Sequence, residues 1–259
     1  MTPWNPPCYL KFVAERSRPA YDLVARIGLD RPTRIADIGC GPGNSTQALR
    51  ERWPDSEIVG VDDSAEMIRN AAETYPAGQW ICADAAEWRP GVRYQVVFSN
   101  AALQWIPDHP RLFGRLFDLV DAGGVLAVQV PANQETPLHR SLLRVSAREP
   151  WRDAMRGCGA LLTYRDARFY YDLLAPRAKR LDMWQTTYYH VLPSHQGLID
   201  WSSSTSMRPY LDRLGGEEER ARFREEVLAG CVQDYPAQAD GAILFPFPRL
   251  FMIACKPPG

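Results

Sequence analysis

Hydrophobic and polar positions alternate in blocks along the first half of the chain. Short apolar runs are typical of strands, and the segments between them are typical of helices. The predicted strands are 35–38, 57–62, 79–84, 94–100 and 123–130, and the predicted helices are 45–53, 64–75 and 111–120. Asn44 is expected at or near the N-cap of the first helix, and Ser64 is the expected N-cap of the second. This alternation predicts an α/β fold with a mainly parallel sheet covered by helices on both faces.

The second half has a different pattern. Residues 131–180 are predicted to be helical and irregular, 183–192 a strand, 194–201 and 217–235 helices, and 243–256 a last strand. Pro246 and Pro248 favour a bulge or a strand start in that last run over a central ladder. We interpret residues 1–259 as a single domain. Its predicted parts are an N-terminal lid segment, 1–30, and helical insertions at 131–180 and 193–240 that form the substrate side.

The stretch "RIADIGCGPGNST" holds three glycines in five positions directly after an apolar run. Glycines allow positive φ and close approach of the backbone to a ligand. The G-x-G-x-G spacing differs from the dinucleotide pattern G-x-G-x-x-G, and Pro42 lacks an N–H for a pyrophosphate. Asp37 would repel a pyrophosphate, whereas it suits an ammonium or sulfonium, and S-adenosylmethionine carries both. A glycine turn without a ligand is the alternative.

Acidic residues end the next two predicted strands. Asp62 lies 19 residues after Gly43, where a ribose-binding carboxylate is expected in this kind of fold. Asp63, the next residue, either shares the ribose contact with Asp62 or reduces the part that Asp62 plays in it. For Asp62 and Asp63 alike, the alternative is a helix cap or an exposed aspartate. Asp84 ends the third strand and is expected to accept from the adenine amino group, with the Ala85 N–H beside it. Met67 either packs on the adenine or belongs to the core.

Composition narrows the choice of partners. The net charge is −1 and the pI about 6.4, which gives no reason to expect nucleic acid or an anionic membrane as a partner. The six cysteines lie far apart, without C-x-x-C or metal-ligand spacing, as expected of reduced thiols in the cytoplasm. The first residues do not have the pattern of a signal peptide, and no apolar run is long enough for a membrane span. We expect a cytoplasmic enzyme without a metal, and a monomer.

Several quoted stretches resemble a known family. "DIGCGPGNST", "VDDS" and "CAD" resemble the first three motifs of class I S-adenosylmethionine-dependent methyltransferases. "WNPPCYLKFVAERSRPA", "SNAALQW", "TTYYHVLPSHQGLIDW" and "FPRLFMIA" extend the resemblance from Trp4 to near Lys256, toward members that methylate small tricarboxylates. The resemblance implies a Rossmann-like sheet of about seven strands, S-adenosyl-L-methionine as cofactor and S-adenosyl-L-homocysteine as product.

The implied reaction is methyl transfer to one carboxylate of a small tricarboxylate, with trans-aconitate as the expected substrate. A carboxylate is ionised at pH 7, so no catalytic acid or base is expected. Another small carboxylic acid is the nearest alternative. A nicotinamide-dependent oxidoreductase and a non-catalytic cofactor-binding module are the alternatives from other classes.

Candidate site residues follow from these motifs and from charge. Arginines suit carboxylates because of their bidentate fork, although each one alone is as readily a solvated surface residue. Arg18 is favoured for the methionine carboxylate of the cofactor, His190 has a core histidine as its alternative, and Trp4, Tyr9 and Trp105 form either a lid or core. The cofactor set is Tyr9, Arg18, Asp37, Gly39, Cys40, Gly41, Asn44, Asp62, Asp63, Met67, Asp84, Ala85 and Asn100. The substrate set is Arg16, Gln104, Trp105, Tyr188, His190 and Arg208.

Overall fold

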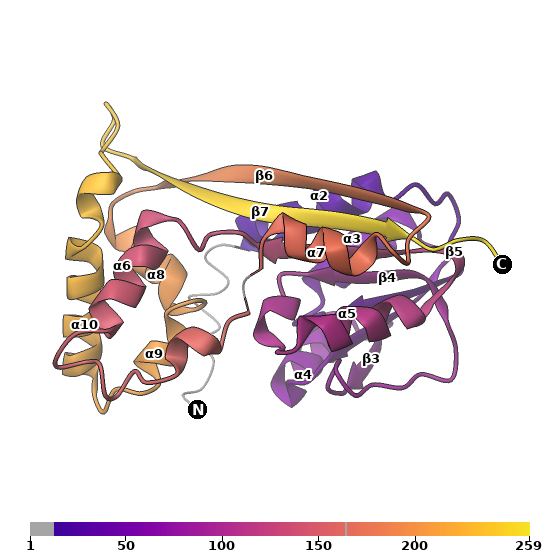
Figure 1. Cartoon of the computed structure of the whole chain (residues 1–259), viewed down its shortest axis with the longest axis horizontal. Helices are drawn as coiled ribbons and strands as arrows, with labels where there is room; N and C mark the ends of the chain where they lie inside the picture. Colours follow the sequence, from indigo (N-terminus) through magenta and orange to yellow (C-terminus); the bar gives the residue numbers. More distant parts are fainter. Residues whose placement is uncertain (1–12, 164) are drawn as a thin grey trace. The chain divides into compact units, whose positions relative to one another are not determined.

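The computed structural model describes residues 13–163 and 165–259, so Trp4 and Tyr9 lie outside the described residues. The chain divides into two compact units. Of the described residues, the α/β unit comprises Arg16–Pro131, 163, 165–186 and Arg249–Gly259, and the helical unit comprises 13–15, Ala132–Leu162 and Thr187–Pro248. The long strands β6 (Arg180–Leu192) and β7 (Ile243–Cys255) contribute residues to both units (Figure 1).

The sheet has seven strands in the order β3-β2-β1-β4-β5-β7-β6. The first five strands are β1 (Arg34–Ile38), β2 (Glu57–Asp62), β3 (Gln79–Cys82), β4 (Tyr94–Asn100) and β5 (Val120–Pro131). Their pairings are parallel, and β7 runs antiparallel to β5. The predicted α/β fold with a mainly parallel sheet of about seven strands is confirmed.

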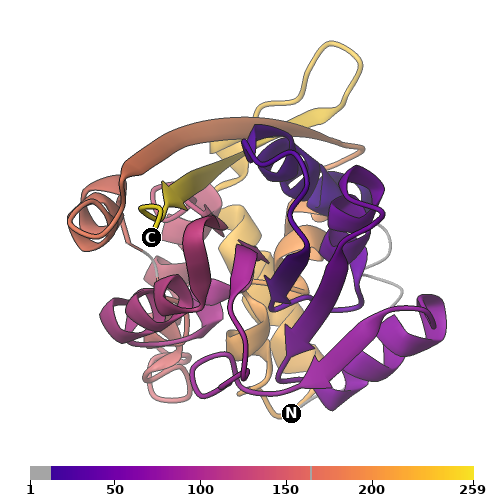
Figure 2. The same ribbon diagram turned by 90° about the vertical axis from the view of Figure 1, so that its right-hand side faces the viewer.

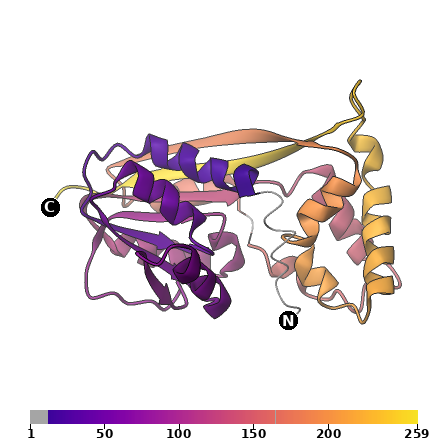
Figure 3. The same cartoon turned by 180° about the vertical axis from the view of Figure 1, so that it is seen from behind.

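Helices cover both faces of the α/β unit. Helices α5 (His109–Asp118) and α7 (Ala167–Leu174) lie on the face toward the viewer in Figure 1. Helices α2 (Val13–Arg26) and α3 (Asn44–Arg52) lie on the opposite face, which is turned forward in Figure 3. Figure 2 shows the twist of the strands between these two helical layers.

Two helix starts can be compared with the capping pattern. Ser64 caps α4 (Ala65–Thr74), because its side chain accepts from the Met67 N–H. The cap of α3 is Gly43 in the left-handed conformation, and Asn44 is the first helical residue. Asn44 therefore lies next to the cap, as expected, and the cap itself is glycine because a φ of 95° suits glycine better than asparagine.

The last strand differs in part from its prediction. β7 begins at Ile243, before both prolines, so the strand does not start at them. Its ladder with β5 runs from Arg249, opposite Pro131, to Cys255, opposite Val125. Both prolines precede this ladder, so the N–H group that proline lacks removes no hydrogen bond from it.

The helical unit has a core of its own. It contains α6 (Pro137–Ser146), α8 (Gln196–Ser203), α9 (Arg208–Leu211) and α10 (Glu217–Ala229), with α10 packed against α6 and α8. Large buried side chains of this core include Trp151, Trp201, Tyr210, Phe223 and Phe245. The predicted helix 217–235 is too long, because residues 232–234 form a separate 3-10 turn. The role of this unit as the substrate side stays a prediction.

In residues 13–163 and 165–259, no helix is both long enough and apolar enough to cross a bilayer.

Candidate functional site

The glycine loop joins β1 to α3 and is tied to the end of β2. The N–H groups of Gly39 and Cys40 both donate to the Val61 carbonyl, at 2.7 and 3.1 Å. Gly39 has a φ of 70°, and a Cβ at this position would come within 2.1 Å of the Ala102 Cβ. Gly41 also has positive φ, but a Cβ there would meet nothing within 4 Å. The loop is therefore closed on the Gly39 side and open at Gly41.

Asp37 is fully buried directly beneath this loop. Its Oδ2 accepts from the hydroxyls of Ser45 and Thr46 in α3, at 2.7 and 2.6 Å. Its Oδ1 has no hydrogen-bond partner among the described residues. Burial raises the pKa of Asp37 to about 6, and the two hydroxyls oppose that rise. A cationic ligand group would offset the cost of keeping this carboxylate ionised.

Asp62 at the end of β2 orders the two loops around it. Its Oδ2 accepts from the Gly41 N–H and its Oδ1 from the Ser64 N–H, both at 2.9 Å. Burial raises its pKa, and these two backbone bonds act in the opposite direction. Each oxygen has a second lone pair, so the carboxylate keeps acceptor capacity for ligand hydroxyls. The neighbouring Asp63 is exposed.

The residues expected to contact the adenine lie near the surface. Asp84 is exposed, beyond the end of β3, and its Oδ1 accepts from the Ala86 N–H at 2.7 Å. Ala85 and Met67 are half-buried. Met67 is thus not a core side chain, which was one of its two interpretations.

The loop after β4 folds back toward the glycine loop. Ala101 takes a left-handed φ of 54°, and its N–H donates to the Gln129 carbonyl at 3.0 Å. Gln104 is buried, and its amide donates to the Ala101 carbonyl at 2.7 Å. Trp105 is 43 % exposed, which excludes a role as ordinary core. Asn100 is half-buried, with no hydrogen-bond partner for its Oδ1 in the described part of the chain.

A buried histidine that the sequence analysis missed holds this loop. His109 lies at the start of α5, with its Nε2 3.0 Å from the Leu103 carbonyl and its Nδ1 2.9 Å from the Tyr170 hydroxyl. Because a carbonyl only accepts, Nε2 carries the proton and Nδ1 accepts from the tyrosine. Burial lowers the pKa of His109, which favours this neutral form.

A second missed pair lies further along the sheet. Arg249 of β7 is 4 % exposed, and its Nη1 donates to Oε1 of the fully buried Gln129 in β5, at 3.1 Å. Each residue interrupts an otherwise apolar strand, "GVLAVQV" and "FPRLFMIAC". A polar residue inside a buried strand is the sequence signal that identifies such positions.

The predicted residues on α2 and in the loop have contrasting environments. Arg16 is buried and Arg18 is exposed. Cys40 is 3 % exposed, and burial raises the pKa of its thiol, so the sulfur stays protonated. Asn44 is half-buried in the first turn of α3.

Three predicted substrate residues belong to the helical unit. Tyr188 and His190 are buried, and the His190 ring stacks on Trp201 with centroids 4.3 Å apart. His190 thus has the environment of a core histidine. Arg208 is one third exposed, and its Nε lies 3.8 Å from Asp212 Oδ2, one turn along the helix.

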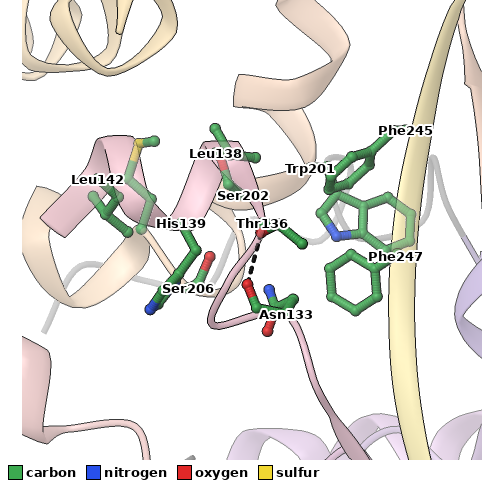
Figure 4. Close-up of a pocket in the computed structure, with 11 residues that line it drawn as sticks. Asn133, Thr136, Leu138, His139, Leu142, Trp201, Ser202, Ser206, Phe245 and Phe247 are labelled. Carbon is green, nitrogen blue, oxygen red and sulfur yellow. Dashed lines mark hydrogen bonds between the residues drawn. The ribbon is translucent and has the colours of Figure 1, made fainter. Parts of the chain in front are cut away.

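The helical unit also contains a pocket of about 290 Å³, including its opening to solvent (Figure 4). In Figure 4, His139 and Ser206 lie at one end, Trp201 and Phe247 at the other, and Asn133 between them. None of the predicted substrate residues lines this pocket. In the residues that the structure describes, no three histidine, cysteine or acidic side chains are grouped so as to hold a metal.

Two comparisons of sequence bear on this site. Residues 12–215 match the family model for a methyltransferase domain. The chain is 44% identical over 256 residues to a trans-aconitate 2-methyltransferase of Azoarcus sp. (strain BH72), covering 99% of this chain and 100% of that protein. A protein of the same name from Yersinia pestis (strain Pestoides F) is 45% identical, with 98% of both chains covered. This chain belongs to their methyltransferase family. It is an S-adenosylmethionine-dependent enzyme, and the buried acid at Asp37 fits the positive charges of that cofactor.

Solved structures support the fold. The YcgJ protein of Bacillus subtilis has a TM-score of 0.60 and 13% identity, with 93% of this chain and all of that chain covered. A phosphoethanolamine N-methyltransferase 2 of Haemonchus contortus, solved with S-adenosylhomocysteine, has a TM-score of 0.58 and 15% identity. It covers 93% of this chain and 53% of its own. At these identities the likeness shows the Rossmann-like methyltransferase fold alone.

Proposed function

We propose that this methyltransferase transfers a methyl group to one carboxylate of trans-aconitate, giving the monomethyl ester and S-adenosylhomocysteine. The observation that carries the proposal is the 44–45% identity to two proteins of that name over nearly the whole of each chain. The similarity therefore includes the helical unit, and not only the cofactor motifs that many methyltransferases share.

The cofactor roles are proposed from the strand ends of the α/β unit. Asp62 accepts from the ribose hydroxyls through the lone pairs that its two backbone bonds leave over. Gly41, with open space at its Cβ position, lets the ligand approach the backbone. Asp37 balances positive charge. The other proposed cofactor contacts are Tyr9, Arg18, Gly39, Cys40, Asn44, Asp63, Met67, Asp84, Ala85 and Asn100.

The proposed methyl transfer needs no side chain to act as an acid or a base. S-adenosylmethionine, when bound, supplies a methyl carbon made electrophilic by its sulfonium. The substrate carboxylate is already ionised at neutral pH, so the chain has no proton to remove. Its residues instead hold the carboxylate oxygen about 3 Å from the reacting carbon, in line with the bond that breaks, and exclude water. Proposed substrate contacts are Arg16, Gln104, Trp105, Tyr188, His190 and Arg208.

Radiolabelled methyl transfer tests this function. The purified enzyme is incubated with labelled S-adenosylmethionine and, in separate reactions, trans-aconitate, cis-aconitate, isocitrate, citrate and a set of dicarboxylates. We expect kcat/KM to be highest for trans-aconitate, with a monomethyl ester as product. Highest activity on another small acid would reassign the substrate within the same reaction class, and no transfer to any carboxylate would reject the proposal.

We further propose a cytoplasmic monomer, as its composition and small substrate suggest. Size-exclusion chromatography with light scattering checks the oligomeric state, with a mass near 29.3 kDa expected.

A further inference from the structure

Strand register aligns the acidic residues of the site on one face of the sheet. Asp37 pairs with Gly60 on β2 and with Phe98 on β4. Asp62 lies two residues beyond Gly60, and Asn100 two residues beyond Phe98. Side chains alternate along a strand, so Asp62, Asp37 and Asn100 point from the same face near the carboxyl ends of their strands.

The same register continues to the other side of the sheet. Asn100 pairs with Gln129 on β5, and Gln129 pairs with Phe251 on β7. Arg249 lies two residues from Phe251 and shares its face, as the hydrogen bond from Arg249 to Gln129 requires. We call the five residues Asp62, Asp37, Asn100, Gln129 and Arg249 the polar row. It is acidic at β2 and β1, neutral at β4 and β5, and cationic at β7.

The Arg249–Gln129 bond fixes the direction of the Gln129 amide. A guanidinium only donates, so Gln129 must present Oε1 to Arg249 and turn its Nε2 elsewhere. That Nε2 is buried and has no acceptor among the described residues. An unused buried donor costs free energy unless a ligand accepts from it.

We propose that Gln129 Nε2 and Arg249 together bind a carboxylate of the substrate that is not methylated. The inference rests on the proposed function, which supplies a tricarboxylate. A carboxylate accepts from both groups and satisfies the buried amide donor of Gln129, beside a guanidinium that is itself buried. The order of charge in the polar row then suits both ligands, because the acids face the cationic cofactor and the arginine faces the anionic substrate.

Gln129→Glu tests this assignment with a small change of shape. The new carboxylate pairs with Arg249 inside the protein and so occupies the place of the substrate carboxylate. We expect an unchanged or higher melting temperature, S-adenosylhomocysteine affinity within twofold of wild type, and a KM for trans-aconitate raised at least tenfold. A residue with a purely structural role would not raise KM while the fold and the cofactor site remain intact.

Gln95→Glu is the matched control. Gln95 lies at the opposite end of β4, where its Oε1 accepts from the Thr33 hydroxyl at 2.9 Å and from the Arg34 N–H at 3.3 Å. Gln95→Glu adds the same negative charge to the same sheet, far along the strand from the polar row. We expect its KM for trans-aconitate to stay within twofold of wild type. Equal increases in KM for both Gln→Glu variants would attribute the effect to net charge and overturn the assignment.

Arg249→Lys supplies a second, independent variant. Lysine keeps the charge but loses the fork, so we expect a KM increase of about three- to tenfold with a smaller change in kcat. If Gln129→Glu does not fold, this variant decides. A KM within twofold of wild type in the variants that fold overturns the assignment and leaves the proposed function standing. If wild-type enzyme methylates no tricarboxylate, both the function and the assignment are rejected.

Discussion

The two ends of the polar row are built in different ways. At the acidic end, Asp37 and Asp62 lie within 25 residues of each other, and hydrogen bonds to Ser45, Thr46, Gly41 and Ser64 fix both carboxylates. At the cationic end, Gln129 and Arg249 are 120 residues apart and meet only because β7 pairs with β5. The acidic end is therefore formed by residues close together in the sequence, and the cationic end by residues that strand pairing brings together.

Because the two ends of the polar row are built differently, they suit ligands of opposite charge. Backbone N–H groups and hydroxyls already hold the acids at β1 and β2, which leaves single oxygen atoms or lone pairs for a cationic, hydroxyl-bearing ligand. The donors at β5 and β7 present N–H groups and positive charge, which suit an anion. Opposite charge at the two ends places cation and anion recognition on the same face of one sheet.

The largest expected effect is a loss of stability when a side chain is added at Gly39, in the glycine loop at the acidic end. Gly39→Val should lower the free energy of unfolding by about 3–5 kcal/mol, because a β-branched residue is strained at positive φ and its Cβ clashes with Ala102. Chemical denaturation measures the loss, and calorimetry with S-adenosylhomocysteine measures the accompanying loss of affinity.

Gly41→Ala is the control for Gly39→Val. It has the same left-handed backbone but open space around the new Cβ, so we expect a loss of only about 1 kcal/mol. Similar losses in the two variants would show that backbone strain, rather than the contact with Ala102, dominates at Gly39.

The same contrast explains which features the sequence predicted: those formed by residues that are close together in the chain. Glycine spacing, Asp62 and the Ser64 cap are local patterns, and the strands that carry them were predicted to within a few residues. Asn44 was expected at or near the cap of α3 and lies next to it, while Gly43, in the left-handed conformation, is the cap itself.

Long-range pairs could not be predicted in this way. Gln129 and Arg249 each stand out as a polar residue in an apolar strand, but their contact depends on β7 lying next to β5. His109 and Tyr170 are 61 residues apart and meet across α5 and α7. Hydrophobic periodicity identifies the buried face of each element, yet it does not say which elements are neighbours.

Removing the carboxylate at the end of β2 is the second test of the acidic end. Asp62→Ala should weaken S-adenosylhomocysteine binding by about 1–3 kcal/mol, because ribose hydroxyls lose a charged acceptor and the Gly41 N–H loses its partner. Calorimetry measures the affinity. Asp63→Ala, a change of the exposed neighbour, should alter it by less than about 0.5 kcal/mol. Equal effects at the two positions would contradict the ribose assignment.

Arg208→Ala asks whether the cationic end of the row is sufficient for a substrate with three charges. We expect KM for trans-aconitate to rise about tenfold, or about 1.4 kcal/mol, at unchanged cofactor affinity. Arg208→Lys should recover part of this, since a point charge does not reproduce the fork. Steady-state kinetics with both variants provides the measurement. Wild-type KM in both would remove Arg208 from the substrate set and leave the other cationic candidates.

The pH dependence of cofactor binding tests the buried charge of Asp37. Its pKa in the folded chain is raised to about 6, so the folded state holds a proton more tightly than the unfolded state does. Stability of the ligand-free protein should therefore fall as pH rises from about 4 to 6. The affinity for S-adenosylhomocysteine, whose ammonium favours the ionised acid, should rise about fivefold from pH 5 to 7.5. Asp37→Asn should flatten both profiles, and profiles that keep their slope in this variant would assign the titration to another group.

The smallest expected effect is at Asp84, where the acidic end meets solvent. Asp84→Ala should weaken S-adenosylhomocysteine binding about two- to threefold, because water replaces an exposed acceptor at little cost. It also removes the bond that Asp84 accepts from the Ala86 N–H, so part of any loss comes from the turn. Asp84→Asn separates these contributions, since an amide oxygen still accepts from that N–H while the negative charge is gone. Calorimetry on both variants should give wild-type affinity for Asp84→Asn. A loss beyond tenfold in both variants would show that the charge of Asp84, rather than an acceptor oxygen, holds the ligand.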